Sequence, residues 1–177
     1  MKALTSGILV SILIFNAGVV SGADDSNEIV SVSIGQIQAD QNQLDDHKYI
    51  STGQPDSDVL TVVADAGFKT VIDLRGVEEN RGIDEPAEVA RLGMQYVLIP
   101  VAGAEDINYE NAAKLDQILA EADGPVFLHC ASGNRVGALV ALRARMNGAS
   151  ADDALMLGKK AGLTRAEDVV KVRLAEH

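Results

Sequence analysis

The segment VFLHCASGNR, residues 126–135, carries most of the information on the fold. It begins as a short apolar run of the kind that forms a strand covered on both faces, and it reaches the single cysteine of the chain, Cys130. Small residues then lead to Arg135, and the apolar stretch 136–146 predicts a buried helix that Asn147-Gly148 ends. The segment therefore predicts a strand, a tight loop and a helix, with Cys130 at the carboxyl end of the strand.

Similar apolar runs over residues 70–74 and 96–101 predict two more strands covered on both faces, and residues 49–51 predict a shorter one. The alternation of strands and helices predicts an α/β fold in which helices flank a mainly parallel sheet. Ligands bind such sheets beyond the carboxyl ends of the strands, where Cys130 is expected. The predicted helices are one capped by Asp56 or Ser57 and ended by Gly67, two over residues 85–92 and 109–121, and two after residue 148 capped by Ser150 and Thr164.

The first 23 residues have the layout of a secretory signal: Lys2, an apolar stretch over residues 7–20, and small residues before a cleavage point after Ala23. The apolar stretch is shorter than the roughly 20 residues that a membrane span needs, and Ser11 and Asn16 interrupt it. We therefore expect a periplasmic or secreted protein with no membrane partner after cleavage.

The rest of the 177-residue chain divides into two parts on composition. Residues 24–47 are polar and predict an N-terminal extension, in which a β-like patch over residues 29–34 is a candidate edge strand. Residues 48–177 predict one globular domain.

The chain is acidic, with 15 basic and 26 acidic residues and a net charge of −11. A field of this sign repels nucleic acid and anionic membrane surfaces. An anionic substrate must therefore be small and must be held by local cations.

Cys130 has no cysteine partner, so it is either a buried apolar thiol or a reactive one. In the predicted loop, the backbone N–H groups of Ala131, Ser132, Gly133 and Asn134 curl into a nest at a helix N-terminus, where an anion is favoured. Two anions fit this field: the thiolate of Cys130, or an oxyanion held above the sulfur by Arg135. His129 is expected to hydrogen-bond the loop backbone rather than to act as a base.

These features resemble the signature of cysteine-dependent protein tyrosine and dual-specificity phosphatases. The wider layout is similar to the bacterial phosphatase-like domain that also occurs in beta-lactamase-hydrolase-like proteins, through ISTGQP at 50–55, TVIDLR at 70–75 and YVLIPV at 96–101. The resemblance covers about residues 48–163 and implies the three-layer fold of the dual-specificity phosphatases.

The resemblance also implies roles for individual residues. Cys130 would be the nucleophile that forms a cysteinyl-phosphate, Arg135 the clamp of the transition state, and residues 131–134 the source of amides for a phosphorylated substrate. Asp106 would be the general acid, with Glu105 as the next candidate. No cofactor or metal is expected, and His47, His129 and His177 show no ligand spacing.

The sequence departs from the phosphatase signature at two places. Four residues separate Cys130 from Arg135 instead of five, and Val136 stands where a serine or threonine usually bonds the sulfur. The shorter loop CASGNR also resembles the active loop of rhodaneses, in which the cysteine carries a persulfide. Three functions therefore stay open: a phosphatase, a sulfurtransferase that uses Cys130, and an anion-binding module without turnover.

Three other residues are expected to be structural. Asp73 and Arg75 are interpreted as an internal ion pair, and Gln54 as a stabiliser of its turn.

Overall fold

The computed structural model describes residues 29–31 and 49–176. Within these residues the chain forms a sheet of five strands in the order β1-β2-β5-β3-β4, and every neighbouring pair is parallel. The predicted α/β fold is confirmed, and β5, the strand that leads to Cys130, lies at the centre of the sheet. The strands are β1 Ile29–Ser31, β2 Tyr49–Thr52, β3 Thr70–Asp73, β4 Gln95–Leu98 and β5 Val126–His129.

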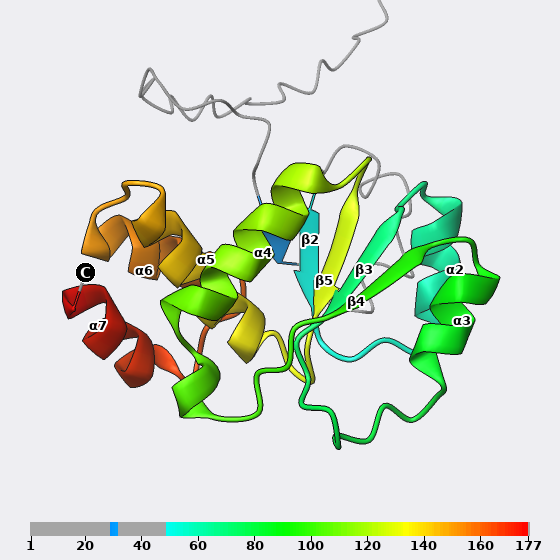
Figure 1. Ribbon diagram of the computed structural model, residues 1–177, viewed down its shortest axis with the longest axis horizontal. Coiled ribbons are helices and arrows are strands. Elements are labelled where there is room, and N and C mark those ends of the chain that lie inside the picture. The colour runs from blue at the N-terminus through cyan, green and yellow to red at the C-terminus, as the bar shows by residue number, and fades with distance from the viewer. Residues whose placement is uncertain (1–28, 32–48, 177) are drawn as a thin grey trace, which may run out of the picture.

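The helices cover both faces of the sheet, which gives three layers (Figure 1). Two helices, α2 (Ser57–Asp65) and α3 (Glu85–Arg91), lie on one face, and a short 3-10 turn, η3 (Ala104–Asp106), follows β4. The described helices include none that combines the length and the apolar character needed to cross a lipid bilayer. The helices of the other face are α4 Tyr109–Glu121, α5 Asn134–Met146, α6 Ala151–Lys160 and α7 Glu167–Ala175.

The side chains of the central strands point alternately to the two faces of the sheet and so contribute to two separate hydrophobic cores. Val71 of β3 and Phe127 of β5 pack with the residues of α2 and α3, whereas Ile72 and Leu128 belong to the larger core beneath α4 to α7. Successive side chains of a strand point to opposite faces, so one apolar run serves both layers. This is why β3 and β5 lack polar alternation in the sequence.

The first three residues of the patch at 29–34 form β1, so an edge strand does lie there, paired with β2. The predicted signal segment and the rest of the extension lie outside the described residues.

The prediction of a strand over residues 96–101 covered on both faces is wrong. The strand runs over Gln95–Leu98 and is partly exposed, because β4 is the other edge of the sheet. Beyond the strand, Ile99 N still donates to Asp73 O at 3.0 Å and Val101 N to Leu74 O at 3.2 Å, so the chain stays close to β3 as it leaves the sheet.

Two predicted helix starts are also corrected. The helix expected from residue 136 begins at Asn134, which places Arg135 in its first turn. Thr164 does not cap α7, which begins at Glu167 without a side-chain cap. Instead, the carboxamide oxygen of Asn134 accepts hydrogen bonds from the Thr164 hydroxyl at 3.2 Å and its backbone N–H at 2.9 Å.

Helices α5 and α6 pack backbone against backbone at two glycines. A Cβ atom on Gly137 would collide with the backbone N of Leu163 and would lie 2.5 Å from the carbonyl oxygen of Gly158. A Cβ atom on Gly158 would in turn lie 2.7 Å from the carbonyl oxygen of Gly137. The absence of side chains at these two positions therefore sets the distance between the helices.

The interior also contains an ionic network around three fully buried side chains, which is larger than the pair predicted from the sequence. Arg75 donates to both carboxylate oxygens of Asp73 at 2.9 Å and also to Glu85, with all three side chains inaccessible to solvent. Asp73 further accepts hydrogen bonds from Arg81 Nε at 3.0 Å and from the Tyr96 hydroxyl at 2.8 Å. The expected internal pair of Asp73 and Arg75 is confirmed, as part of a larger network.

The packing of α5 on α6 generates the first prediction. Gly137→Ala should lower the free energy of unfolding by about 3 kcal/mol. The new methyl group overlaps backbone atoms of the facing segment, so the whole segment would have to shift to make room for it. Gly148→Ala is the matched control, since that glycine has a φ of +94° but no atom within 4 Å of a new Cβ. It should cost only the strain of a left-handed backbone, about 1 kcal/mol. Urea unfolding followed by circular dichroism measures both, and equal losses would contradict the account of the helix contact.

The network generates a prediction on acid stability. Burial by itself would raise the pKa of Asp73, but the hydrogen bonds from Arg75, the charge of His129 and the bond from Tyr96 outweigh it and lower the pKa from 3.8 to about 2. A carboxylate with a lowered pKa stabilises the fold above its unfolded value, and that contribution is lost as the pH falls from about 4 to about 2.

Asp73→Asn should therefore flatten the loss of stability between pH 4 and pH 2, by about 2 kcal/mol in the unfolding free energy. It should also destabilise the protein at neutral pH, because Arg75 loses its partner in the interior. Glu88→Gln removes a carboxylate from a solvent-exposed pair with Arg91 and should leave the acid limb nearly unchanged. An Asp73→Asn protein that keeps the full acid slope would refute the role of this carboxylate.

Candidate active site

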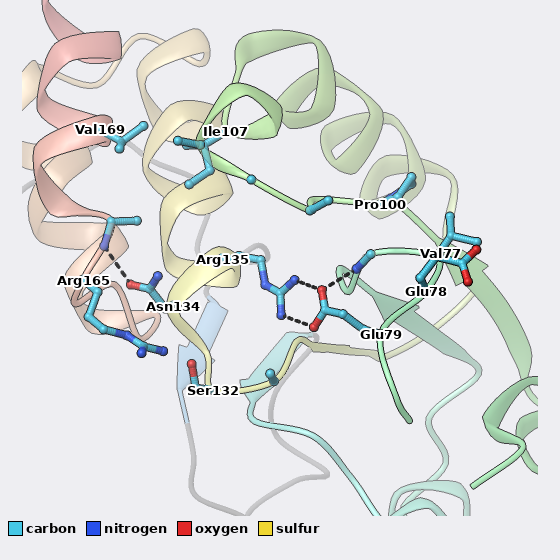
Figure 2. A pocket seen from close by; sticks show the side chains of 16 residues that line it. Val77, Glu78, Glu79, Pro100, Ile107, Ser132, Asn134, Arg135, Arg165 and Val169 are labelled. Atoms are coloured by element: carbon cyan, nitrogen blue, oxygen red, sulfur yellow. Dashed lines mark hydrogen bonds and ion pairs between the residues drawn. The ribbon is translucent and has the colours of Figure 1, made fainter. Parts of the chain in front are cut away.

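A pocket of about 880 Å³ opens at the carboxyl edge of the sheet, beside the turn from β5 into α5 (Figure 2). Loops that follow three strands meet there, as expected for a parallel sheet. The predicted loop after β5 is one of its walls. The wall residues are Gly76, Val77, Glu78 and Glu79 after β3, Pro100, Ala102, Gly103, Ala104 and Ile107 after β4, Ala131, Ser132, Asn134 and Arg135 after β5, and Arg165, Ala166 and Val169 before and in α7.

The turn from β5 into α5 depends on Gly133, whose φ of +79° is left-handed. A residue with a Cβ adopts this conformation at a cost, and glycine does not. The first hydrogen bond of the helix runs from Gly137 N to Gly133 O at 2.9 Å. The N–H groups of residues 134–136 precede it in the first turn, so they have no partner within the helix and are available to an anion.

The strand next to β5 fixes the outer side of the same loop. Gly53 forms a bridge with Ser132, and Gln54 N donates to Ala131 O at 3.3 Å. The side chain of Gln54 donates to Arg81 O at 3.0 Å and so ties two loops of the site together. The side chain of Gln54 thus has a structural contact, but it bonds a distant loop and not its own turn as predicted.

The sulfur of Cys130 lies beneath the floor of the pocket. The residue is 1% exposed and packs with the larger hydrophobic core, while the next residues, Ala131 and Ser132, are exposed and form the wall. The sulfur nevertheless faces the guanidinium of Arg135. The pKa of Arg135 is raised mainly by its hydrogen bond to Glu79, against the effect of burial, and further by the charge of Cys130 and a hydrogen bond with it. The structure therefore brings together the two residues on which the predicted chemistry depends.

Arg135 is held in place by a carboxylate that the sequence analysis did not identify. Its Nη1 atom donates to Glu79 Oε1 and to Val101 O at 2.9 Å, and Nη2 donates to Glu79 Oε2 at 2.9 Å (Figure 2). These bonds use three of the five N–H groups of a guanidinium, which leaves two for other partners. The hydrogen bond from Arg135 is in turn the main reason that the pKa of Glu79 is lowered, so this carboxylate stays ionised.

The loop that carries Glu79 is attached to the buried network through Arg81. Arg81 donates to the carbonyl oxygens of Gly76 at 3.3 Å, Val77 at 3.1 Å and Glu79 at 3.0 Å. Its Nε atom donates to Asp73 at 3.0 Å. Glu79 is thus fixed over Arg135 by its own backbone as well as by its side chain. The sequence carried only a general signal for this role, because the loop follows a predicted strand and the strands of a parallel sheet end at one edge.

The structure places Asp106 in a loop beside the pocket but directs its carboxylate to its own backbone. Asp106 Oδ2 accepts hydrogen bonds from Ala102 N at 2.8 Å and Gly103 N at 3.3 Å. Neither Asp106 nor Glu105 belongs to the residues that line the pocket, although their neighbours Ala104 and Ile107 do. In this conformation the carboxylate of Asp106 shapes the loop.

His129 does not bond the loop backbone, so that prediction is wrong. Its Nε2 atom lies 2.7 Å from Glu85 Oε1, without the geometry of a hydrogen bond, and neither ring nitrogen has a hydrogen-bond partner among the described residues. Donor atoms of Asp73, Glu85 and His129 lie within 4.8 Å of one another. The donor set does not fit a metal cation, because Arg75 bonds both carboxylates and Arg81 bonds Asp73, so two guanidinium charges already balance them.

Comparisons with known proteins identify the family and the fold of the chain. The sequence model of a family described as a DSP-PTPase phosphatase fused to NAD+ kinase matches residues 23–171. Two proteins named beta-lactamase hydrolase-like protein are similar in sequence, one from Xylella fastidiosa (strain Temecula1) with 35% identity over 101 residues and one from Agrobacterium fabrum with 34% over 100. The alignments cover 55% and 54% of this chain but 23% of each relative, so the matched region spans about a quarter of their length.

Solved structures of phosphatases share the fold. A candidate phosphatase from Neisseria meningitidis Z2491 aligns with a TM-score of 0.60 and 22% identity over 71% of this chain and 93% of that one. PTPMT1 aligns with a TM-score of 0.57 and 19% identity over 75% of this chain and 92% of that one. Tk-PTP in its active form aligns with a TM-score of 0.56 and 22% identity, over 75% of this chain and 95% of that one.

At these identities the solved structures establish the three-layer phosphatase fold, and the family match establishes the relationship in sequence. The predicted resemblance to phosphatase-like domains is confirmed. The chain belongs to the family of DSP-PTPase phosphatases described as fused to NAD+ kinase.

Proposed function

We propose that this phosphatase-family chain hydrolyses a phosphomonoester with Cys130 as the nucleophile. The observation that carries the proposal is the guanidinium of Arg135 beside the sulfur of Cys130, at the N-terminus of α5 and next to a pocket. The thiolate is the reactive form of a cysteine nucleophile, and Cys130 attacks in this form in the proposed reaction. The guanidinium and the free helix N–H groups bind the oxygens of a phosphoryl group in the transition state.

The proposed reaction has two steps. The thiolate of Cys130 attacks phosphorus, the bond from phosphorus to the ester oxygen breaks, and the released oxygen takes up a proton. Water then attacks the cysteinyl-phosphate, which yields inorganic phosphate and restores the thiolate. Because Cys130 is 1% exposed, the phosphoryl group has to enter between the loop amides and the guanidinium to reach the sulfur.

Asp106 remains our proposed source of the leaving-group proton. Its loop borders the pocket, and its two hydrogen bonds come from backbone N–H groups, which a small rotation of the side chain would release. Glu79 is unsuited to this role, because its lowered pKa keeps it ionised on Arg135. Glu105 stays the second candidate, as an exposed carboxylate in the same loop.

A sulfurtransferase is the alternative that one specific observation favours. The loop places only four residues between Cys130 and Arg135 and so encloses less space than the phosphatase loop. One added sulfur atom on Cys130 needs less room than a tetrahedral phosphoryl group. In that reaction the Cys130 thiolate would attack the outer sulfur of thiosulfate, the S–S bond of thiosulfate would break, and sulfite would leave. The persulfide sulfur would then pass to cyanide or a thiol, which gives thiocyanate or a new persulfide and restores the Cys130 thiolate.

One comparison on purified protein separates the two reactions. We expect release of p-nitrophenol from its phosphate ester, and its loss in Cys130→Ser by at least about a thousandfold, because the hydroxyl is not ionised at neutral pH. Mass spectrometry after treatment with thiosulfate tests for one extra sulfur atom on Cys130. A persulfide without phosphate release would favour the sulfurtransferase, and neither signal would leave an anion-binding module.

The contact between Glu79 and Arg135 generates a separate prediction. Glu79→Gln should lower kcat by about tenfold, because the neutral amide cannot hold both guanidinium nitrogens, and KM should change less. Glu79→Asp keeps the charge and should restore part of kcat. The control is Glu110→Gln, which breaks an exposed pair with Lys114 and should leave kcat unchanged.

The Glu79 variants also need a measure of folding. If Glu79→Gln and Glu79→Asp lower the thermal midpoint equally but differ in kcat, the carboxylate acts by positioning Arg135. If kcat falls in proportion to the thermal midpoint in Glu79→Gln, Glu79→Asp and Glu110→Gln alike, Glu79 only stabilises the fold and the positioning role is wrong.

A further inference from the structure

The pocket is much larger than the group that the proposed reaction transfers. Its volume of about 880 Å³ lies in the range of sites that enclose a whole small molecule rather than a single phosphoryl group. The apolar part of the lining comes from the segment after β4 and from the start of α7 and the residues before it: Pro100, Ala102, Ile107, Ala166 and Val169. The organic part of a substrate would therefore lie against an apolar surface.

Four charged residues line this pocket, and two of them neutralise each other. Arg135 and Glu79 form the pair described above. Arg165 and Glu78 remain, and they lie at opposite ends of the pocket, with Arg165 on the side of Ser132 and Asn134 (Figure 2). The two ends of the pocket thus carry charges of opposite sign, with the cation of Arg165 at one end and the carboxylate of Glu78 at the other.

Arg165 differs from the other arginines of this acidic chain. Each of the remaining arginines among the described residues donates at least one hydrogen bond to a carboxylate or a carbonyl oxygen. Arg165 is exposed and makes no hydrogen bond or ion pair with any residue that the structure describes. Its guanidinium is available for a ligand.

The backbone around Arg165 is nevertheless fixed to the active loop. Asn134 Oδ1 accepts a hydrogen bond from Ala166 N at 3.1 Å (Figure 2) and another from Thr164 N at 2.9 Å, and these two residues stand on either side of Arg165. Asn134 is the first residue of α5 and the neighbour of Arg135. One side chain therefore sets the position of the second arginine relative to the first.

We infer that Arg165 binds a second anionic group of the substrate. The preferred substrates are phosphomonoesters with an apolar organic part that carries a further phosphate or carboxylate at its other end. Arg135 holds the phosphoryl group that is transferred, the apolar wall contacts the spacer, and Arg165 holds the second anion through a planar pair of N–H groups. This inference rests on the proposed phosphatase function and names its substrate class.

Alkyl phosphates that differ only in the second anion test the inference. The protein should hydrolyse 1,4-butanediol and 1,6-hexanediol bisphosphates with a kcat/KM about tenfold or more above that of butyl and hexyl phosphate. Arg165→Gln should abolish this preference, so that kcat/KM for each bisphosphate falls to the level of the matching alkyl monophosphate in the same variant. Arg91→Gln removes the same charge from an exposed ion pair on α3 and should keep the preference.

The outcomes distinguish the two proposals. Equal hydrolysis of mono- and bisphosphates by the wild-type protein, or a preference that survives Arg165→Gln, would overturn the role of Arg165 and leave the phosphatase intact. If no ester is hydrolysed, the phosphatase proposal fails. Calorimetry then tests separately whether Arg165 binds a second anionic group. The Cys130→Ser protein should then bind hexanediol bisphosphate more tightly than hexyl phosphate, and Arg165→Gln in that background should remove the difference.

Discussion

Asp73 is a buried carboxylate at the carboxyl end of β3, and two arginines bond to it. Arg75 ties it to Glu85 of α3, and Arg81 ties it to the carbonyl oxygens of the loop that carries Glu79. A carboxylate in the interior is tolerated only when its charge is paired and its lone pairs are bonded, so neither arginine is dispensable. Glu79 then holds Arg135, which faces Cys130. The surroundings of the candidate nucleophile are thus connected to one interior charge through three side chains, those of Arg81, Glu79 and Arg135.

The sequence predicted those features that neighbouring residues decide. Cys130 and Arg135 are close in the chain, and the left-handed Gly133 between them turns the strand into the helix, so their meeting follows from local rules. The partners of Arg135 are distant: Glu79 is 56 residues away. Their contact depends on the strand order, in which β3 and β5 are neighbours although β4 lies between them in the chain. Sequence patterns predict that a sheet is parallel but not which of its strands are adjacent.

The errors at β4 and α7 have the same origin. The run over residues 96–101 is apolar enough for a central strand, but its position at the edge was set by the strand order. Thr164 is a good capping residue by type, yet the carboxamide of Asn134, which is 30 residues away, takes both its hydroxyl and its backbone N–H. In both places a contact between distant segments overrode a correct local preference.

The shorter loop makes Arg135 more important than it would be in a longer one. A loop with fewer residues presents fewer amides to a phosphoryl group, and Val136 is buried in the core and has no hydroxyl with which to bond the sulfur. In the proposed reaction the guanidinium would have to supply a larger share of the stabilisation, through the two N–H groups that Glu79 and Val101 do not use. A clamp with so few remaining donors is effective only if its plane is fixed. The bidentate contact with Glu79 provides that constraint, and the buried Asp73 network holds the loop that makes it.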